Sequence, residues 1–392
     1  MKFVVFALSL SLCVAGCQSA GKKKDSQPLL KDTARSATPS FPRLSDDEVK
    51  KYHDEAAYYF NKTLPASRFN GGILIAKNGQ IVFERYSGFK DLRTKKDSID
   101  DATTFQIAST SKTFTAGAIL KLMQEGKIKL DQQVSDFFPN FPYAVTVKML
   151  LDHRSGLPNY LNYMEAMGIN RNKAVTNEDV ITSLINNKPP QAYRPDVHFN
   201  YCNTNYVLLA SIVEKVSGVP FPQYMKQNFF DPLGMTHTFI KTNADSATVN
   251  YSYQWNDALW RPDFSDGPYG DKNVYSTPRD LLKWDQALYT NAIFSKETLD
   301  LAFTPYSNEK PSQHNYGLGW RLLFPTPDKK VIYHNGRWHG FNSCFDRLVD
   351  DKATIIILNN RLNIGIYNIS RKAYDIFGNY SGKAAEKDDN KE

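Results

Sequence analysis

A serine and a lysine three residues apart are the pair in this 392-residue chain best suited to covalent chemistry. Ser109 and Lys112 form an S-x-x-K pattern, and a spacing of three along a helix brings both side chains to one face. The lysine amine could then take a proton from the serine hydroxyl, which would make Ser109 a nucleophile. A helix cap followed by a solvated lysine gives the same pattern, so the motif needs support from the rest of the chain.

The helix expected from about Thr110 to Glu125 supplies such support. Its residues are mostly apolar, which predicts a buried helix, and Gly126 is placed to end it in a left-handed cap. A lysine is seldom buried without a partner, so Lys112, one turn into such a helix, favours a functional role. The start of the helix also directs unpaired backbone N–H groups toward Ser109.

A tyrosine and an asparagine further along the chain could face this pair. Tyr201 and Asn203 lie between a proline-rich loop and an apolar helix expected from Tyr206 to Val216. Tyr201 could share proton transfer with Lys112, and Asn203 could hydrogen-bond the substrate or the lysine. The alternative is a helix-capping asparagine beside a core tyrosine.

A third polar segment, from His334 through Asn335 and Gly336, ends an expected strand just before Arg337. A glycine at a strand end lets a substrate backbone approach closely. His334 and Arg337 could bind a substrate carboxylate, the arginine through paired hydrogen bonds. A hairpin turn with exposed polar residues is the alternative.

Secondary structure expected at both ends of the chain could position these groups. Ser45 and Glu48 form a capping box that begins a helix. Asn78-Gly79 favours a type I′ turn between two strands, at 72–77 and 80–86. A helix capped by Thr277 with Pro278 at its first position follows the middle of the chain. The C-terminal region reads as a meander of strands with a final helix, at 316–324, 330–335, 341–349, 354–359 and 364–377.

These elements predict an α+β fold. The two ends pair into one antiparallel sheet flanked by helices, the middle forms an all-helical lobe, and the active site lies in the cleft between them. The sheet lobe is expected to comprise residues 45–105 and 300–380, and the helical lobe residues 106–299.

The N-terminus reads as a targeting signal. Residues 1–16 begin with a lysine, continue with an apolar run too short to span a bilayer as a helix, and end in small residues. Val14 to Cys17 resembles a bacterial lipobox, which implies cleavage before Cys17 and lipid on its sulfur. Residues 17–44 are then a flexible tether, and 381–392 a charged tail. We expect an exported lipoprotein, anchored to a membrane and facing the periplasm or the cell surface.

Composition limits the partners. The net charge is +7, much of it in the N-terminal region, and no basic stripe with aromatic residues indicates nucleic-acid binding. Cys202 and Cys344 are expected to be separate thiols, because one pair in a chain of this size is not a disulfide framework. With no C-x-x-C motif or Cys/His cluster, we predict neither a metal nor a cofactor.

The motifs together resemble one family. Five segments match, in order, elements of the class C β-lactamase, DD-peptidase and family VIII esterase-like serine hydrolases, over roughly residues 60–365. They are the nucleophile segment (105–114), an LLxHxSGLP-like loop (150–158), a YxN element (201–203), the start of a later helix (270–281) and a KTG or HxG element (334–336).

The resemblance implies a β-lactamase/transpeptidase-like fold and an acyl-enzyme mechanism. Ser109 would attack a carbonyl carbon while Lys112 or Tyr201 takes its proton, the identity of the base being disputed for S-x-x-K enzymes. The backbone N–H groups of Ser109 and Arg337 would form an oxyanion hole, and water would then hydrolyse the acyl-enzyme.

One departure from the family pattern bears on the substrate. The third element begins with His334 instead of lysine, which favours a peptidase or an esterase over efficient β-lactam turnover. We therefore expect a D-amino-acid peptide or an ester as substrate, with a class C-like β-lactamase as the alternative. A peptidoglycan- or peptide-binding sensor without turnover is the rival from another class, but a binder would not need a serine nucleophile and its lysine.

Overall fold

The computed structural model describes Met1 and residues 39–242 and 250–381. The chain divides into two units, 1–34 and 35–392, and everything described from residue 39 onward belongs to the second. The predicted signal peptide, the lipidation site at Cys17 and nearly all of the charged tail lie outside the described residues. Among the helices of the described ranges, none is long and apolar enough to cross a membrane.

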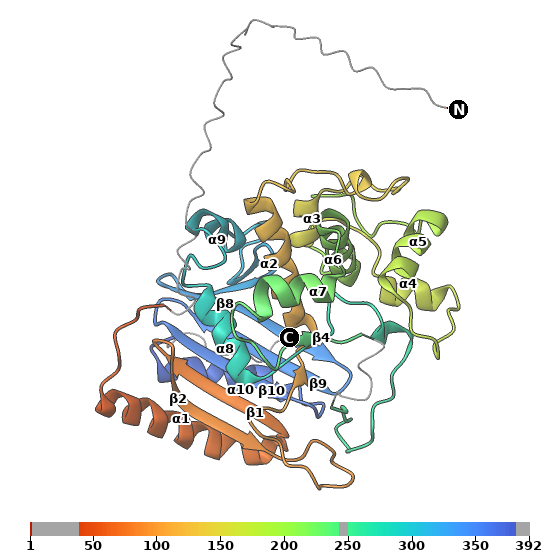
Figure 1. The fold of residues 1–392 in the computed structure, drawn as a ribbon. Helices are drawn as coiled ribbons and strands as arrows, with labels where there is room; N and C mark the ends of the chain where they lie inside the picture. The colour runs from red at the N-terminus through yellow and green to blue at the C-terminus, as the bar shows by residue number, and fades with distance from the viewer. Residues whose placement is uncertain (2–38, 243–249, 382–392) are drawn as a thin grey trace, which may run out of the picture. The chain divides into compact units, whose positions relative to one another are not determined.

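A seven-stranded antiparallel sheet in the order β2-β1-β10-β9-β8-β7-β6 joins the two ends of the chain, as the sequence predicts (Figure 1). Gly71 at the start of β1 lies opposite Asn359 at the end of β10. The strands are β1 (Gly71–Lys77), β2 (Gln80–Ser87), β6 (His314–Tyr316), β7 (Arg321–Thr326), β8 (Lys329–Trp338), β9 (Phe341–Leu348) and β10 (Ala353–Asn359).

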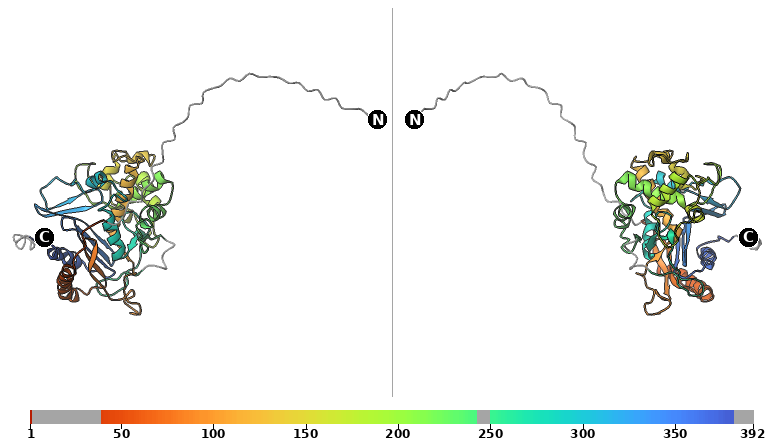
Figure 2. Two further views of the ribbon diagram at one scale, coloured as in Figure 1. Left: turned by 60° about the vertical axis from the view of Figure 1, so that its left-hand side comes forward. Right: turned by 90° about the vertical axis from the view of Figure 1, so that its right-hand side faces the viewer.

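Helices cover both faces of the sheet, because successive side chains of a strand point to opposite sides. Ile73 and Ile75 face α1 (Asp46–Ser67), α10 (Gly365–Lys372) and the 3₁₀ turn η6 (Ala373–Ile376). Leu74 belongs to the core on the other side, with α2 (Ser111–Gln124) and α8 (Pro278–Ala287). The views in Figures 1 and 2 place α1 on the side of the sheet away from the helical domain.

The helical domain is built around α6 (Asn203–Ser217), which packs against α2, α3, α5 and α7. Its other helices are α3 (Val147–Leu151), α4 (Tyr160–Ala166), α5 (Asn177–Asn187) and α7 (Phe221–Met225). A small second sheet of β3 (Phe105–Gln106), β5 (Val274–Ser276) and β4 (Phe239–Ile240) leads into α2. Helix α9 (Lys296–Ala302) also packs against α2.

Local predictions hold best where one signal fixes the backbone. The capping box between Ser45 and Glu48 is present, and Asn78 and Gly79 both have positive φ (52° and 72°), as a type I′ turn requires. Cys202 and Cys344 are buried free thiols, as expected. These signals lie within a few residues of the structure that they determine.

Several boundaries differ from the prediction. The strand expected over 316–324 is broken into β6 and β7, because a turn at Gly319 (φ 88°) packs against Ala116. The last helix tightens into a 3₁₀ turn at Ala373. Helix α8, assigned from the sequence to the helical lobe, packs on β1 and β10 of the sheet. At Gly319 and in α8, long-range contacts override the local pattern.

Candidate active site

The nucleophile segment is a sharp turn between β3 and α2. Ala108 adopts a left-handed conformation (φ 49°), which costs an L-residue roughly 1–2 kcal/mol, and Ser109 follows in a short 3₁₀ turn, η1 (Ala108–Thr110). The Thr110 hydroxyl donates to the His334 carbonyl at 3.0 Å and lies 2.9 Å from the Ser343 hydroxyl. Strands β8 and β9 therefore hold the turn that presents Ser109.

Lys112 is fully buried, and its Nζ has three oxygen acceptors. It lies 3.2 Å from Ser109 Oγ, 2.9 Å from Asn203 Oδ1 and 2.8 Å from the backbone oxygen of Asp271. The structure thus brings together three of the predicted site residues. No residue type in the sequence indicates the Asp271 carbonyl, because any residue can supply a backbone acceptor.

Tyr201 lies against the lysine. The Lys112 Nζ is 5.0 Å from the centroid of the tyrosine ring. The Tyr201 hydroxyl is buried and has no hydrogen-bond partner among the described residues. Leaving a buried hydroxyl unpaired costs free energy, and such an exception in a native site calls for an explanation. A substrate or a transferring proton would supply the missing partner.

His153 holds the tyrosine segment in place. Its ring packs 4.3 Å from the Tyr201 ring, and its Nδ1 accepts a hydrogen bond from the Cys202 backbone N–H at 3.1 Å. Burial, followed by the nearby Lys112 charge, holds the pKa of His153 well below its usual range. The imidazole is therefore neutral at physiological pH, with its proton assigned to Nε2. The LLxHxSGLP-like loop contained this residue, but the sequence indicated no role for it.

His334 is also buried and neutral. Burial, with the Arg321 and Lys112 charges, holds its pKa well below the usual range. Its Nε2 lies 3.2 Å from the Tyr316 hydroxyl and its Nδ1 lies 2.8 Å from the Asn335 carbonyl. A neutral ring with both nitrogens engaged gives no support to the predicted contact between His334 and a substrate carboxylate.

Gly336 serves a purpose different from the predicted one. A Cβ at this position would lie 2.2 Å from the Ile107 carbonyl and 3.0 Å from the Ser109 backbone nitrogen. The missing side chain therefore lets β8 lie directly against the nucleophile segment. A substrate backbone that approaches this strand would therefore meet the two neighbours of Gly336. Of these, Asn335 is half-buried and Arg337 is exposed.

Arg321 is a functional candidate that the sequence reasoning missed. Its guanidinium carbon lies 5.1 Å from the Tyr201 ring centroid and 6.0 Å from the Tyr316 ring centroid. The ion pairs formed within the described part of the chain do not include Arg321. The only signal in the sequence is a single charge at the start of an apolar strand. Its distance from Tyr201 follows from the pairing of Arg321 with Tyr333, the neighbour of His334.

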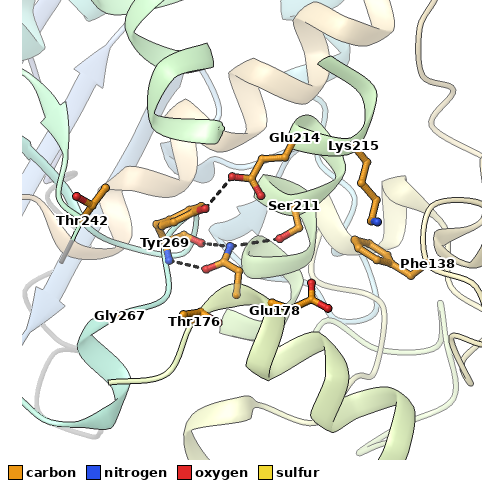
Figure 3. A pocket seen from close by; sticks show the side chains of 10 residues that line it. Phe138, Thr176, Glu178, Ser211, Glu214, Lys215, Thr242, Gly267 and Tyr269 are labelled. Carbon is orange, nitrogen blue, oxygen red and sulfur yellow. Dashed lines mark hydrogen bonds between the residues drawn. The ribbon is translucent and has the colours of Figure 1, made fainter. Parts of the chain in front are cut away.

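Two other features lie outside this group. The helical domain contains a hollow of about 330 Å³. Figure 3 shows its lining, where the Glu214 carboxylate accepts a bond from the Tyr269 hydroxyl. Asp263, Asp266 and His339 lie close enough to ligate one ion, but Asp266 already accepts bonds from His339 and the Trp338 indole.

A serine hydroxyl at a helix start, bonded by a buried lysine and flanked by a tyrosine and an asparagine, defines a serine hydrolase type of site on a β-lactamase/transpeptidase-like fold. The chain belongs to the family described as Beta-lactamase, whose sequence model matches residues 62–371. It is 33% identical over 312 residues to penicillin-binding protein 4* of Bacillus subtilis, covering 75% of this chain and 68% of that protein.

Solved structures agree on the fold. The octameric penicillin-binding protein homologue from Pyrococcus abyssi superposes with a TM-score of 0.72 at 27% identity, over 86% of this chain and 79% of that one. A D-amino acid amidase from Ochrobactrum anthropi superposes with a TM-score of 0.69 at 22% identity, over 83% of this chain and 98% of that one. The identity to the amidase is low, so it supports the fold alone.

Proposed function

We propose that this protein forms an acyl-enzyme on Ser109 and hydrolyses a D-amino-acid peptide, with a carboxylic ester as the second candidate substrate. The observation that carries the proposal is the hydrogen bond between Lys112 and Ser109, with the lysine fixed by Asn203 and the Asp271 carbonyl. A lysine that only stabilised the fold would not need to end on a half-buried serine hydroxyl at a helix start.

The proposed reaction begins with attack of Ser109 Oγ on the substrate carbonyl carbon. The hydroxyl proton passes to Lys112 acting as a neutral amine, which is within hydrogen-bonding distance, or to Tyr201 acting as a phenolate, whose oxygen has no hydrogen-bond partner among the described residues. The backbone N–H groups of Ser109 and Arg337 stabilise the oxyanion, each contributing about 3 kcal/mol. The same proton leaves with the departing group, and water then attacks the ester on Ser109.

Arg321 supports a substrate that carries a carboxylate. The neutral His334 supplies no positive charge, whereas Arg321 places a guanidinium beside Tyr201 without an acidic partner among the described residues. A carboxylate is the group that a guanidinium binds best, through two parallel hydrogen bonds. This favours a peptide with a free C-terminus over a neutral ester. A β-lactam also carries a carboxylate and remains the alternative substrate.

Covalent labelling tests the nucleophile. Wild type and Ser109→Ala are treated with a fluorophosphonate, a penicillin and a p-nitrophenyl ester, and their intact masses are compared. A fluorophosphonate adduct on wild type alone supports the proposal, and equal labelling of the two proteins refutes it. The rival reading, a sensor without turnover, predicts acyl adducts that persist after the free reagent is removed.

A substrate pair tests the role of Arg321. A D-alanyl-D-alanine peptide is compared with the same peptide amidated at its C-terminus. In Arg321→Met the kcat/KM for the free acid should fall about 10- to 100-fold, as expected for a charge-assisted bond worth roughly 1.5–3 kcal/mol, while the amide is unaffected. Arg371→Met serves as the control, because Arg371 lies in α10 on the other face of the sheet. An equal loss for both substrates would rule out carboxylate binding.

We also propose that the protein is exported and anchored through lipid on Cys17. The support is the lipobox-like sequence after an apolar run. Mass spectrometry of the mature N-terminus tests this, with Cys17→Ser as the matched variant. An unmodified Cys17 in the membrane fraction, or a precursor insensitive to globomycin, would refute it.

A further inference from the structure

A second buried lysine lies next to the proposed catalytic group. Lys272 has only 2% of its side chain exposed, and its Nζ donates to the Tyr160 hydroxyl and lies 3.2 Å from Asp271 Oδ2. The Tyr160 hydroxyl in turn lies 3.2 Å from the same carboxylate oxygen. The ammonium group, the phenol and the carboxylate thus form a closed triangle within the protein. None of the three takes part in the reaction described above.

This triangle belongs to the loop that supplies an acceptor to Lys112. The Asp271 side chain is held by Lys272 and Tyr160, and its backbone oxygen accepts the 2.8 Å bond from the Lys112 Nζ. The residues on either side are fastened to α2, since the Gly270 carbonyl accepts from Thr115 and the Val274 N–H donates to Ser111. Asn273 is held as well, through its bonds to Gln106 and to the Asp266 and Pro268 carbonyls, so the contacts of the Asp271 side chain act on the short stretch between Gly270 and Asn273.

Lys272 also reaches the opposite side of the site. Its Nζ lies 4.5 Å from the Trp338 ring, a distance at which a cation is attracted to the face of an indole. Trp338 ends β8 directly after Arg337, whose N–H is proposed to bind the oxyanion. One ammonium group therefore contacts both the loop that orients Lys112 and the end of the strand that borders Ser109.

The location of the pair argues against a purely stabilising role. Burying two charges is costly, and well-packed apolar residues often hold a position as well as a buried ion pair does. Burial lowers the pKa of Lys272, and the Asp271 and Asp266 carboxylates oppose that effect. What an ion pair provides and apolar packing does not is a directional contact. Here that contact sets the orientation of Asp271.

We propose that Lys272 is a positioning residue of the reaction. Together with Tyr160 it fixes Asp271, so that the Asp271 carbonyl holds the Lys112 amine against Ser109, and its contact with Trp338 keeps the end of β8 in register with that amine. The inference rests on the proposed function, because it assumes that the Lys112–Ser109 contact is used in catalysis. It concerns kcat, since Lys272 itself is buried and touches no substrate.

The test compares two variants with a matched control. Lys272→Met removes the charge at similar length, and Asp271→Asn/Lys272→Met also removes the carboxylate that the first variant leaves without its partner. Lys330→Met is the control, because the Lys330 Nζ is half-buried and donates to the Phe303 carbonyl at 2.8 Å. It lies near the opposite end of β8 from Trp338. All three are measured as folded protein, quantified by circular dichroism.

Both Lys272 variants should lose roughly 10- to 100-fold in kcat and in the rate of fluorophosphonate labelling, with KM changed less than about twofold, as for a misplaced reacting group. Lys330→Met should keep the wild-type kcat. In crystals of the double variant, the contact between Lys112 and the Asp271 carbonyl should be lost. A folded Lys272 variant with wild-type kcat, or with that contact retained, overturns the inference.

The two proposals fail in different ways. If wild-type Ser109 takes no label, the proposed function fails. The crystal structure of the double variant still tests whether Lys272 positions the Asp271 carbonyl against Lys112. If wild type is labelled but Lys272→Met matches it, only the positioning role fails. A loss of stability with unchanged kcat in the folded fraction would show that Lys272 is structural.

Discussion

Alanine at position 336 should nearly abolish activity while the protein still folds. The added Cβ would lie 2.2 Å from the Ile107 carbonyl and 2.4 Å from the Ser343 hydroxyl. Ordinary contact between such atoms requires about 3.4 Å or more, so β8 and the nucleophile segment must separate by about 1 Å. Overpacking of this kind costs roughly 1–3 kcal/mol of stability. A displacement of about 1 Å at the reacting group costs roughly 100-fold in rate.

The measurement combines urea unfolding with fluorophosphonate labelling and kcat/KM, each per mole of folded protein. The matched control is Gly71→Ala, whose Cβ would lie 1.9 Å from the Leu358 carbonyl. Gly71 is in β1, which β10 and β9 separate from β8. The control should lose stability and keep its labelling rate. The reasoning is wrong if Gly336→Ala is labelled as fast as wild type, or if Gly71→Ala loses as much activity.

Three further perturbations probe other contacts. Burial raises the pKa of Asp346 to about 6, so between about pH 4 and 6 the folded state holds a proton that the unfolded state has lost, and the protein loses stability as the pH rises. Asp346→Asn should therefore gain about 3 kcal/mol in the free energy of unfolding above pH 7 and nothing below about pH 4. Tyr201→Phe should lower kcat about 10²- to 10⁴-fold at unchanged melting temperature, because the lost hydroxyl has no hydrogen-bond partner among the described residues. Asp285→Ala should lower the free energy of unfolding by about 3–5 kcal/mol, because Arg347 stays buried without its acidic partner. The double variant Asp285→Ala/Arg347→Met should recover most of that loss, as measured by urea unfolding.

Sequence reasoning located the parts of the site that depend on short-range geometry. The contact between Ser109 and Lys112 follows from helical spacing alone, and the apolar pattern of α2 correctly indicated that the lysine is buried. The pairing of the two ends of the chain was also predicted, because strand-like segments separated by short turns occur at both ends. Asn203 entered through a motif, and the structure places it on Lys112.

The remaining contacts depend on long-range registers. Arg321 lies beside Tyr201 because β7 pairs with β8 at Tyr333, which no local pattern reveals. The neutrality of His334 depends on complete burial beneath neighbouring strands and beside two cations. Gly336 was singled out in the sequence because it has no side chain, but the segment that packs against it, from Ile107 to Ser109, lies more than 200 residues earlier in the chain. Residue types can thus indicate which groups take part, whereas their charge states depend on the assembled fold.

The distribution of charge gives the site its character. Lys112 and Lys272 are buried and held by oxygen acceptors, Arg321 is a cation beside the rings of Tyr201 and Tyr316, and His153 and His334 are neutral. A lysine at position 334 would add a further buried charge beside Arg321 and Lys112, where among the described residues the His334 ring has the Tyr316 hydroxyl as its side-chain partner. A neutral histidine avoids that repulsion. The guanidinium of Arg321, on the neighbouring strand β7, then supplies the positive charge that the proposed carboxylate substrate would meet.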